Sequence, residues 1–253
     1  QLFQDLKSEI ITVEDIDDEL RSQLIEAKII VESDEIEFLK LKYLKQNIRF
    51  NKDWLGLTIA PTLHCNFNCI YCFEKSRPAV YMTDAVEDAL IDFVKSKNPN
   101  GVEITWYGGE PLMDFQRIQS ITKRIKDLGL HINAKIISNG YLLTEEKIKQ
   151  FEELNIRSIQ ITLDGMKEIH DKRRYLIDGR GTFDRIIENL RLIAEHTNDE
   201  FRIDVRVNID KTNEHSFNEL FAYLYSRYKS KNLNIYPGFV TEDSNSCASA
   251  DSC

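Results

Sequence analysis

The sequence Cys65-Asn-Phe-Asn-Cys69-Ile-Tyr71-Cys72 places three cysteines in a C-x3-C-x2-C spacing, directly after the short apolar run from Leu57 to Thr62. Three thiolates this close together on a loop can face one metal centre. A cubane iron–sulfur cluster held by three cysteines keeps one iron without a protein ligand. The stretch therefore predicts a metal-bearing loop after a first strand, with an open iron at which chemistry can occur.

Other roles for the three cysteines were weighed against a cluster. A structural zinc site needs a fourth ligand, which would have to be His64, Cys247 or Cys253. Buried cysteines without a ligand usually occur singly, whereas these three stand within eight residues beside polar Asn66 and Asn68. A disulfide framework is disfavoured because five cysteines is an odd number and the chain of 253 residues is long.

From Leu57 onward, β-rich runs alternate with amphipathic stretches. Strands are expected over residues 57–62, 102–106, 134–137, 158–163, 202–209 and 233–236. Helices are expected over residues 83–97, 115–128, 182–196 and 213–229, and another is expected to open at Thr144. Thr83 is a suitable N-cap for the first of them, because its hydroxyl can accept from a free N–H of the first turn.

Strands that alternate with helices are expected to be parallel, since parallel neighbours need crossover connections and these are right-handed. A doubly wound sheet would carry a glycine-rich phosphate turn after its first strand, and residues 62–65 offer none. In barrels the functional residues follow the carboxyl ends of the strands. The cysteines, Gly108-Gly109-Glu110, Ser138-Asn139-Gly140 and Asp164-Gly165 all fall at such places, which favours a single active face.

The cysteine triplet with Tyr71 resembles the signature of the radical S-adenosylmethionine (radical SAM) enzymes. Further motifs are similar to the SPASM-type maturases, the branch that modifies peptides and proteins: Cys72-Phe73-Glu74, Trp106-Tyr107-Gly108-Gly109-Glu110-Pro111, Ser138-Asn139-Gly140, Leu163-Asp164-Gly165 and His170-Asp171-x-x-Arg174. The similarity runs from about Leu57 to Gly238. It implies an α/β fold, a partial (β/α)6 radical SAM barrel with a small N-terminal α+β appendage.

The resemblance also implies the cofactors. Cys65, Cys69 and Cys72 would hold a four-iron four-sulfur (4Fe-4S) cluster, and the amino and carboxylate groups of S-adenosylmethionine would chelate the fourth iron. An external electron donor would then drive reductive cleavage to a 5′-deoxyadenosyl radical. In such a system the cofactor carries the difficult chemistry, while the protein orients and shields it.

Candidate contacts to the methionine part of this cofactor follow from the motifs. Gly108 and Gly109 would let the backbone approach the amino group, and Glu110 could accept a charge-assisted hydrogen bond from it. Arg174 could bind the carboxylate through both arms of its guanidinium, although Arg173 beside it leaves a one-residue ambiguity.

Other side chains suit the nucleoside part of the cofactor. Thr162 could add a hydroxyl contact, and Ser138 and Asn139 suit the ribose hydroxyls. Tyr71 is expected near the adenine, and Asn208 is either a further contact or a satisfied polar strand residue. His64 and His170 have no partner in a recognisable triad motif, and His170 with Asp171 is expected to shape the loop before Arg174.

The two ends of the chain differ from the barrel. Residues 1–54 contain a helix-like piece at 13–27, a β-rich run at 29–31 and an amphipathic stretch at 36–44. They form either a cap on the barrel or a peptide-docking element that takes up a substrate segment by strand addition.

Residues 55–238 form the barrel, and residues 239–253 form a polar tail with Cys247 and Cys253. Those two cysteines are either the first ligands of an auxiliary cluster in a SPASM-type extension, with the chain then a truncated fragment, or part of a vestigial or flexible tail.

The net charge of −9 is spread along the chain, which argues against a nucleic-acid binder. No apolar run is long enough to span a membrane, and a cytoplasmic protein is expected. The resemblance implies a radical SAM oxidoreductase that cross-links or oxidises a side chain of a peptide or protein, in ribosomal peptide maturation. The alternatives are an anaerobic sulfatase-maturing enzyme and a non-catalytic iron–sulfur or zinc protein that binds peptides.

Overall fold

The computed structural model describes residues 15–27, 29–31, 33–50, 53–72, 74, 78–229 and 231–240. The chain divides into two compact units, residues 1–51 and residues 52–253. Each unit is described by itself. The cysteine loop belongs to the second unit, and this unit contains all of the described strands.

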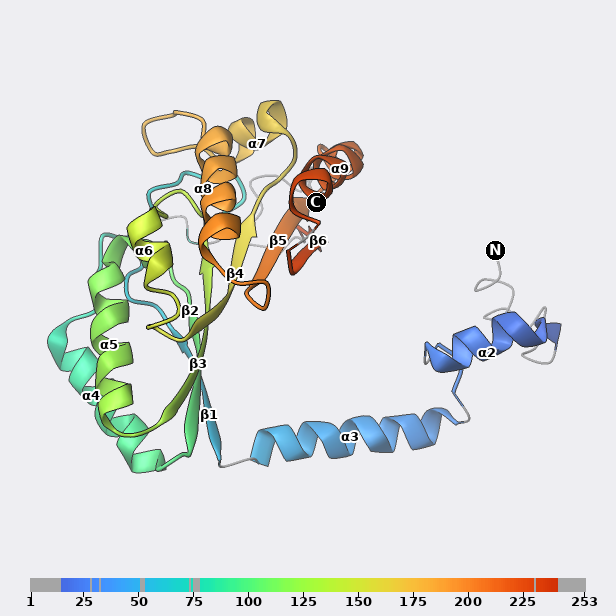
Figure 1. The fold of residues 1–253 in the computed structure, drawn as a ribbon, viewed down its shortest axis with the longest axis horizontal. Helices are drawn as coiled ribbons and strands as arrows, with labels where there is room; N and C mark the ends of the chain where they lie inside the picture. Colours follow the sequence, from blue (N-terminus) through green and yellow to red (C-terminus); the bar gives the residue numbers. More distant parts are fainter. Residues whose placement is uncertain are drawn as a thin grey trace. The chain divides into compact units, whose positions relative to one another are not determined.

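The second unit is built on a six-stranded parallel sheet whose strands follow the order of the chain (Figure 1). The strands are β1 (Trp54–Ile59), β2 (Gly101–Trp106), β3 (His131–Ser138), β4 (Ile156–Thr162), β5 (Arg202–Ile209) and β6 (Leu233–Phe239). Neighbouring strands pair in parallel throughout. Right-handed crossovers in sequential order bring the connecting helices to one face of the sheet. This arrangement confirms the predicted partial (β/α)6 barrel.

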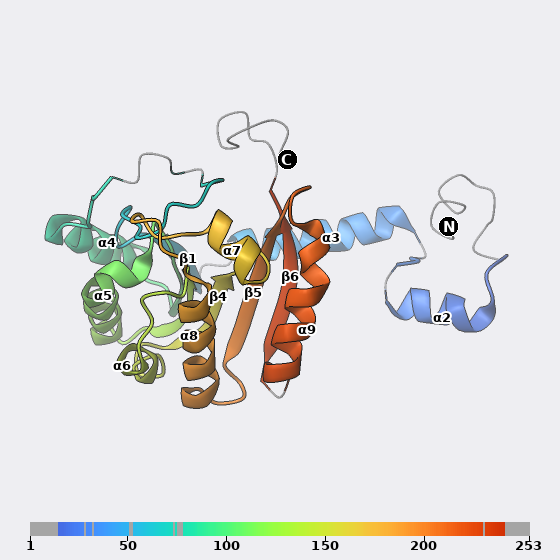
Figure 2. The same cartoon turned by 90° about the horizontal axis from the view of Figure 1, so that it is seen from above.

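Helices cover the convex face of this sheet (Figure 2). They are α4 (Asp84–Lys97), α5 (Phe115–Asp127), α6 (Glu145–Lys149), α8 (Phe183–His196) and α9 (Phe217–Tyr228). The predicted caps are present, since the hydroxyls of Thr83 and Thr144 accept from the N–H groups of Val86 and Lys147. Three short helices lie in the loops that follow β2, β4 and β5: η2 (Pro111–Asp114), α7 (Lys167–Arg173) and η3 (Glu214–Ser216). The sequence did not predict α7 as a helix.

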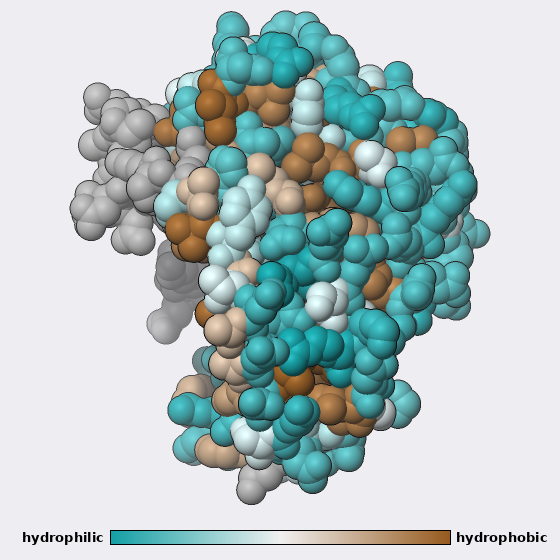
Figure 3. Space-filling model, turned by 90° about the vertical axis from the view of Figure 1, so that its left-hand side faces the viewer, coloured by the Kyte–Doolittle hydropathy of each residue, from teal (hydrophilic) through white to brown (hydrophobic). Residues whose placement is uncertain are grey.

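The core lies between the sheet and these helices. On β5, Ile203, Val205 and Val207 are buried against helices, whereas Arg206 and Asn208 alternate with them and lie on the concave face. The surface over α4, α5 and α6 is mostly hydrophilic, as expected for amphipathic helices (Figure 3). The concave face of the sheet is thus polar rather than filled with apolar side chains, which leaves room for a ligand.

Two further differences from the prediction have a clear physical reason. The first strand ends at Ile59 instead of Thr62, because Pro61 has no N–H to contribute to a ladder. The β-rich run at residues 29–31 is not a strand: the N–H groups of Ile29 and Ile30 both donate to the carbonyl of Leu24, at the end of a helix.

The described part of the first unit is therefore helical, with α2 (Asp18–Glu26) and α3 (Asp34–Phe50), and the predicted α+β appendage is wrong there. Strand addition at residues 29–31 loses its structural basis. Neither α2 nor α3, nor any helix in the described part of the second unit, is long and apolar enough to cross a membrane.

Candidate functional site

A cavity of about 380 Å³ opens at the carboxyl ends of the strands. Of the predicted site residues that the structure describes, all except Glu110 line it: Cys65, Cys69, Tyr71, Cys72, Gly108, Gly109, Ser138, Asn139, Thr162, Arg174 and Asn208. A second cavity, of about 510 Å³, is lined by residues such as Ile156 and Phe201 at the opposite ends of the strands, away from the cysteines. The predicted residues thus converge on one place, as expected for a barrel.

The cysteine loop is held by backbone hydrogen bonds to the end of α7 and to the segment that follows it. Asn68 N–H donates to Tyr175 O at 2.7 Å, and Ile70 N–H donates to Arg173 O at 3.1 Å. The Phe67 side chain is almost fully buried beneath the loop. Burial also raises the pKa of the Cys65 thiol to about 12, so this thiol would release its proton when it binds a metal centre rather than ionise by itself at neutral pH.

The thiols do not form a site for a single ion. Among the described residues, no three His, Cys, Asp or Glu side chains converge closely enough to hold one metal ion. Zinc needs such convergence, whereas each cysteine of a cubane cluster binds a different iron. Cys247 and Cys253, proposed as zinc or auxiliary-cluster ligands, lie outside the described residues. A cluster on three thiolates does not need three side chains to converge on one ion.

The glycine pair after β2 packs against the backbone that leads into the cysteine loop. A Cβ on Gly108, whose φ is +120°, would overlap Thr62 O, and a Cβ on Gly109 would overlap the carbonyls of Leu63 and His64. Gly109 N–H donates to Thr62 O at 3.1 Å. The pair thus has a packing role, and its predicted contact with a methionine amino group stays a prediction.

Changing Gly109 to alanine is expected to lower the free energy of unfolding by about 1–3 kcal/mol, because the new Cβ would push against backbone carbonyls that cannot rotate away. Iron retention should fall as well, since the displaced carbonyls directly precede Cys65. Gly56→Ala on β1 is the matched control, because its Cβ would meet no atom. Denaturant unfolding and iron content measure both effects, and equal behaviour of the two variants would contradict the packing role.

Glu110 lies beneath the cavity rather than on its wall. Its fully buried carboxylate accepts hydrogen bonds from Leu112 N–H at 3.0 Å, Ser138 Oγ at 2.8 Å and Asn139 N–H at 2.7 Å. Burial raises its pKa, and the hydrogen bonds oppose this. Glu110 therefore joins the loops after β2 and β3, and its predicted contact with the cofactor stays a prediction that this position does not support.

The loop after β3 contacts the cysteine loop directly. Asn139 Nδ2 donates to Asn66 Oδ1 at 2.8 Å and lies 3.9 Å from Cys65 Sγ. The Ser138 hydroxyl donates to Glu110 and accepts from Gly140 N–H at 2.9 Å. Both residues line the cavity, but their polar atoms are already engaged, and their predicted contacts with ribose hydroxyls remain predictions.

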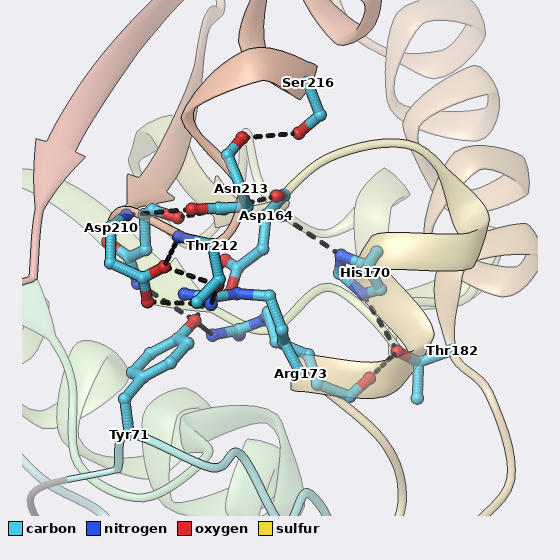
Figure 4. Close-up of polar contacts among 11 residues, drawn as sticks. Tyr71, Asp164, His170, Arg173, Thr182, Asp210, Thr212, Asn213 and Ser216 are labelled. Atoms are coloured by element: carbon cyan, nitrogen blue, oxygen red, sulfur yellow. Dashed lines mark hydrogen bonds and ion pairs between the residues drawn. The ribbon is translucent and has the colours of Figure 1, made fainter. Parts of the chain in front are cut away.

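The two adjacent arginines have different surroundings, and Figure 4 shows those of Arg173. Arg173 Nε donates to Asp164 at 3.0 Å, and Arg173 Nη1 donates to Asp210 at 2.8 Å, so this guanidinium has two carboxylate partners. Burial alone would lower the pKa of Arg173, but Asp164 and Asp210 raise it overall. Arg174 has no ion pair with a described carboxylate, and its buried Nε has no hydrogen-bond partner. Since Arg174 also lines the cavity, it is the arginine that can take a ligand carboxylate.

The Tyr71 hydroxyl joins three sides of the site. It donates to Asp164 at 2.9 Å and accepts from Arg174 Nη1 at 2.8 Å and from Asn208 Nδ2 at 3.1 Å. Burial raises the pKa of Tyr71 well above its usual value, so the hydroxyl stays protonated. The buried Asn208 Oδ1 has no hydrogen-bond partner among the described residues, which leaves an acceptor for a ligand in the cavity that Thr162 also lines.

Those unpartnered polar atoms test whether the cavity suits the implied cofactor. The buried Arg174 Nε is a cationic donor for a carboxylate, and Asn208 Oδ1 is an acceptor for a hydroxyl or amino group. Three thiols at the rim complete a donor set for a cluster. The residues present fit both S-adenosylmethionine and a 4Fe-4S cluster.

His170 connects three backbone segments around Arg174. Its Nδ1 accepts from Asp164 N–H at 3.3 Å, its Nε2 contacts Thr182 Oγ1 at 3.0 Å, and that hydroxyl donates to Arg174 O at 2.6 Å. Because the threonine donates onward, Nε2–H must donate to it, and the ring is neutral. Burial, with Arg174 nearby, lowers the pKa of His170 to about 3. The structure gives His170 the predicted loop-shaping role.

Replacement of His170 by glutamine is expected to weaken the pH dependence of stability. In the folded protein the pKa is about 3, against about 6.5 when unfolded, so the unfolded state binds more protons between these values. The neutral His170 ring therefore contributes fully to the free energy of unfolding above pH 6.5. This contribution is lost as the pH falls toward 3, by up to about 1 kcal/mol per pH unit. Denaturant unfolding between pH 7 and 5 measures the slope, and an unchanged slope in His170→Gln would contradict this assignment.

Several important residues were missed at the sequence level. Asp164 was quoted within a motif but received no role, and Arg173 was treated only as an ambiguity. Asn213 donates to Asp164 O at 2.7 Å and to Asn208 O at 2.8 Å, which no motif indicated. Arg206 lines the cavity too. The alternation of polar and apolar residues on β5 could have found Arg206, because it shares a face with Asn208.

Comparisons with known proteins agree with this geometry. The family model of the radical SAM superfamily matches residues 59–224. The serine-type anaerobic sulfatase-maturating enzyme of Bacteroides thetaiotaomicron is 32% identical over 144 residues, which are 52% of this chain and 34% of that protein. The Fe-coproporphyrin III synthase of Methanosarcina barkeri is 25% identical over 181 residues, 70% of this chain and 43% of that protein.

Two solved structures share the fold. One is native anSMEcpe with bound AdoMet and a Cp18Cys peptide, with a TM-score of 0.62, 22% identity and coverage of 73% of this chain and 51% of that one. The other is Streptococcus suis SuiB bound to S-adenosylmethionine, with a TM-score of 0.57, 18% identity and coverage of 95% and 53%. The chain spans less than half of the length of both curated relatives.

Proposed function

The chain belongs to the radical SAM superfamily, and from that premise we propose that it cleaves S-adenosylmethionine reductively and modifies a side chain of a peptide or protein. This family uses a 4Fe-4S cluster and S-adenosylmethionine. One observation carries the proposal: three thiols, an unpartnered buried arginine nitrogen and an unpartnered asparagine oxygen line the same cavity. These are the groups that the cluster, the methionine carboxylate and a nucleoside hydroxyl would need.

Each residue has a task that follows from its contacts. Cys65, Cys69 and Cys72 would hold the cluster, and Arg174 would bind the methionine carboxylate. Tyr71 positions Arg174 through its hydroxyl, and Asp164 in turn accepts from Tyr71. When bound, the cofactors supply the radical that removes a hydrogen atom from the substrate.

A peptide substrate in ribosomal peptide maturation, with cross-linking or oxidation of a side chain, is the form of this activity that we favour. Two similar proteins support a peptide or protein substrate. One is named a sulfatase-maturating enzyme, and the other was crystallised with a bound peptide. Sulfatase maturation is the second candidate, because the relative with that name is 32% identical to this chain over the matched part.

The experiment offers deuterated peptides to the reconstituted protein with S-adenosylmethionine and a reductant. One set consists of sulfatase-derived peptides that carry a Cys or Ser target. The other consists of peptides encoded by short genes next to the gene of this protein. Deuterium in the deoxyadenosine, with a changed peptide mass, is the expected result, and the set that reacts separates the two candidates. Deoxyadenosine without deuterium from either set would contradict the proposed substrate class.

A further inference from the structure

A second arginine, Arg206, lines the cavity on the concave face of β5. In the sheet register its neighbours are Thr162 on β4 and Tyr236 on β6. Asn208 lies two residues closer to the cysteine end of the same strand. Arg206 is therefore one layer deeper in the barrel than the Asn208 and Tyr71 pair, which contacts Arg174.

Two polar side chains near Arg206, those of Asp204 and Tyr236, are already hydrogen-bonded to other residues. Asp204, the nearest acid on its strand, accepts from Arg202 at 2.9 Å and from Asn234 at 2.9 Å. The Tyr236 hydroxyl donates to Gln160 at 2.7 Å. Arg206 forms no ion pair with a described carboxylate, and its Nε is buried without a hydrogen-bond partner. A buried guanidinium N–H without an acceptor lowers the stability of the folded protein, unless a ligand accepts a hydrogen bond from it.

Gly238 on β6 provides the space that this guanidinium occupies. A Cβ at residue 238 would overlap Arg206 Nε and lie 2.9 Å from Arg206 Cζ and Nη2. The guanidinium therefore leans over Gly238 toward the cysteine end of the strands. Its direction is into the cavity, and it lies against the bare backbone of β6.

The charges that line the cavity indicate what Arg206 can bind. Among the described residues, the lining includes, besides the thiols, the two arginines Arg174 and Arg206 and one carboxylate, Glu74 of the cysteine loop, for which no ion pair with either arginine is found. S-adenosylmethionine has one carboxylate, and Arg174 is placed to bind it. The second arginine thus remains available for another anionic group on the substrate side.

We propose that Arg206 binds a carboxylate of the peptide substrate, either an Asp or Glu side chain or the peptide C-terminus, and so selects which residue lies beside the cofactor. The guanidinium fork matches a carboxylate geometrically. This inference rests on the proposed function, since it assigns the substrate of that same cavity.

The test measures binding of three probe peptides to the reconstituted protein with S-adenosylmethionine and without reductant. The probes are acetyl-Ala-Asp-Ala-amide, acetyl-Ala-Asn-Ala-amide and acetyl-Ala-Ala-Ala with a free C-terminus. At least one carboxylate probe is expected to bind about tenfold or more tightly than the Asn probe. The Asp and free-terminus probes distinguish the two sources of carboxylate. Equal binding of all three probes by the parent would overturn the proposal.

Variants then assign the preference to Arg206. The carboxylate preference should vanish in Arg206→Gln and survive in part in Arg206→Lys. It should persist in Arg202→Gln, which is the matched control because Arg202 lies on the same strand face and is already paired with Asp204. Gly238→Ala should weaken it without unfolding the protein, since the new Cβ meets only the movable end of an arginine.

Two outcomes in this series would overturn the inference. One is a carboxylate preference that persists in Arg206→Gln. The other is a loss of S-adenosylmethionine affinity in Arg206→Gln as large as in Arg174→Gln, which would assign Arg206 to the cofactor. Deoxyadenosine formation by the parent is measured separately. Its absence would contradict the proposed function, whereas its presence without the carboxylate preference would contradict only the role of Arg206.

Discussion

A variant with Cys65, Cys69 and Cys72 all changed to alanine is expected to bind no cluster at the barrel mouth and to form no deoxyadenosine. The thiols line the cavity together, and a cluster held by three cysteines has no protein ligand to substitute for them. The fold should persist, because backbone bonds from Asn68 and Ile70 hold the loop independently of the side chains. Iron content, sulfide content and deoxyadenosine formation under reductant measure the effect.

The control for this variant uses the other two cysteines of the chain. Changing Cys247 and Cys253 to alanine should leave the iron bound by Cys65, Cys69 and Cys72 in place, along with deoxyadenosine formation. Circular dichroism should be alike in both variants. Iron that stays bound when the three loop cysteines are absent, with deoxyadenosine still formed, would contradict the assignment.

Asp164→Ala is expected to lower the free energy of unfolding by about 3 kcal/mol, because removal of one partner leaves buried charge uncompensated. Asp164 is fully buried and accepts from Arg173 Nε and from the Tyr71 hydroxyl. Arg173 keeps Asp210, which limits the loss. The same change removes the acceptor that orients Tyr71, so affinity for S-adenosylmethionine should fall as well.

Asp178→Ala provides the comparison, because Asp178 forms an ion pair with Arg180 at the surface. The side chains of Asp178 and Arg180 are 52% and 72% exposed. Such exposed pairs contribute little to stability, because solvent screens them. Chemical denaturation of the two variants and titration with S-adenosylmethionine give the values. A loss from Asp164→Ala no greater than that from Asp178→Ala would show that the buried network around Tyr71 does not support the site.

The barrel could be predicted because its signals are local. Strand and helix periods alternate along the chain, and the strand β5 was predicted with the observed ends, Arg202 and Ile209. The site residues follow the carboxyl ends of strands, so the topology alone brings them together. The predicted strand at residues 29–31 is wrong because the backbone there has other hydrogen-bond partners. The N–H groups of Ile29 and Ile30 donate to Leu24 O at the end of a helix, so they cannot pair with a strand.

The division of tasks within the site could not be predicted from sequence. Arg173 and Arg174 are adjacent and chemically identical, and only the positions of Asp164 and Asp210 separate them. Glu110 stands in a motif beside the glycine pair, yet its oxygens accept from Leu112, Ser138 and Asn139. Which polar atoms remain without a partner depends on contacts between segments far apart in the chain, and no local pattern carries that information.

The three cysteines are expected to hold a 4Fe-4S cluster whose open iron binds S-adenosylmethionine in the cavity beside Arg174. The most direct measurement is electron paramagnetic resonance of the anaerobically reconstituted, reduced protein before and after addition of S-adenosylmethionine, with deoxyadenosine assayed in the same sample. We expect a cluster signal that changes when S-adenosylmethionine is added, and deoxyadenosine that then forms. Zinc in place of iron, or a cluster whose signal does not change and which never cleaves S-adenosylmethionine, would contradict this expectation.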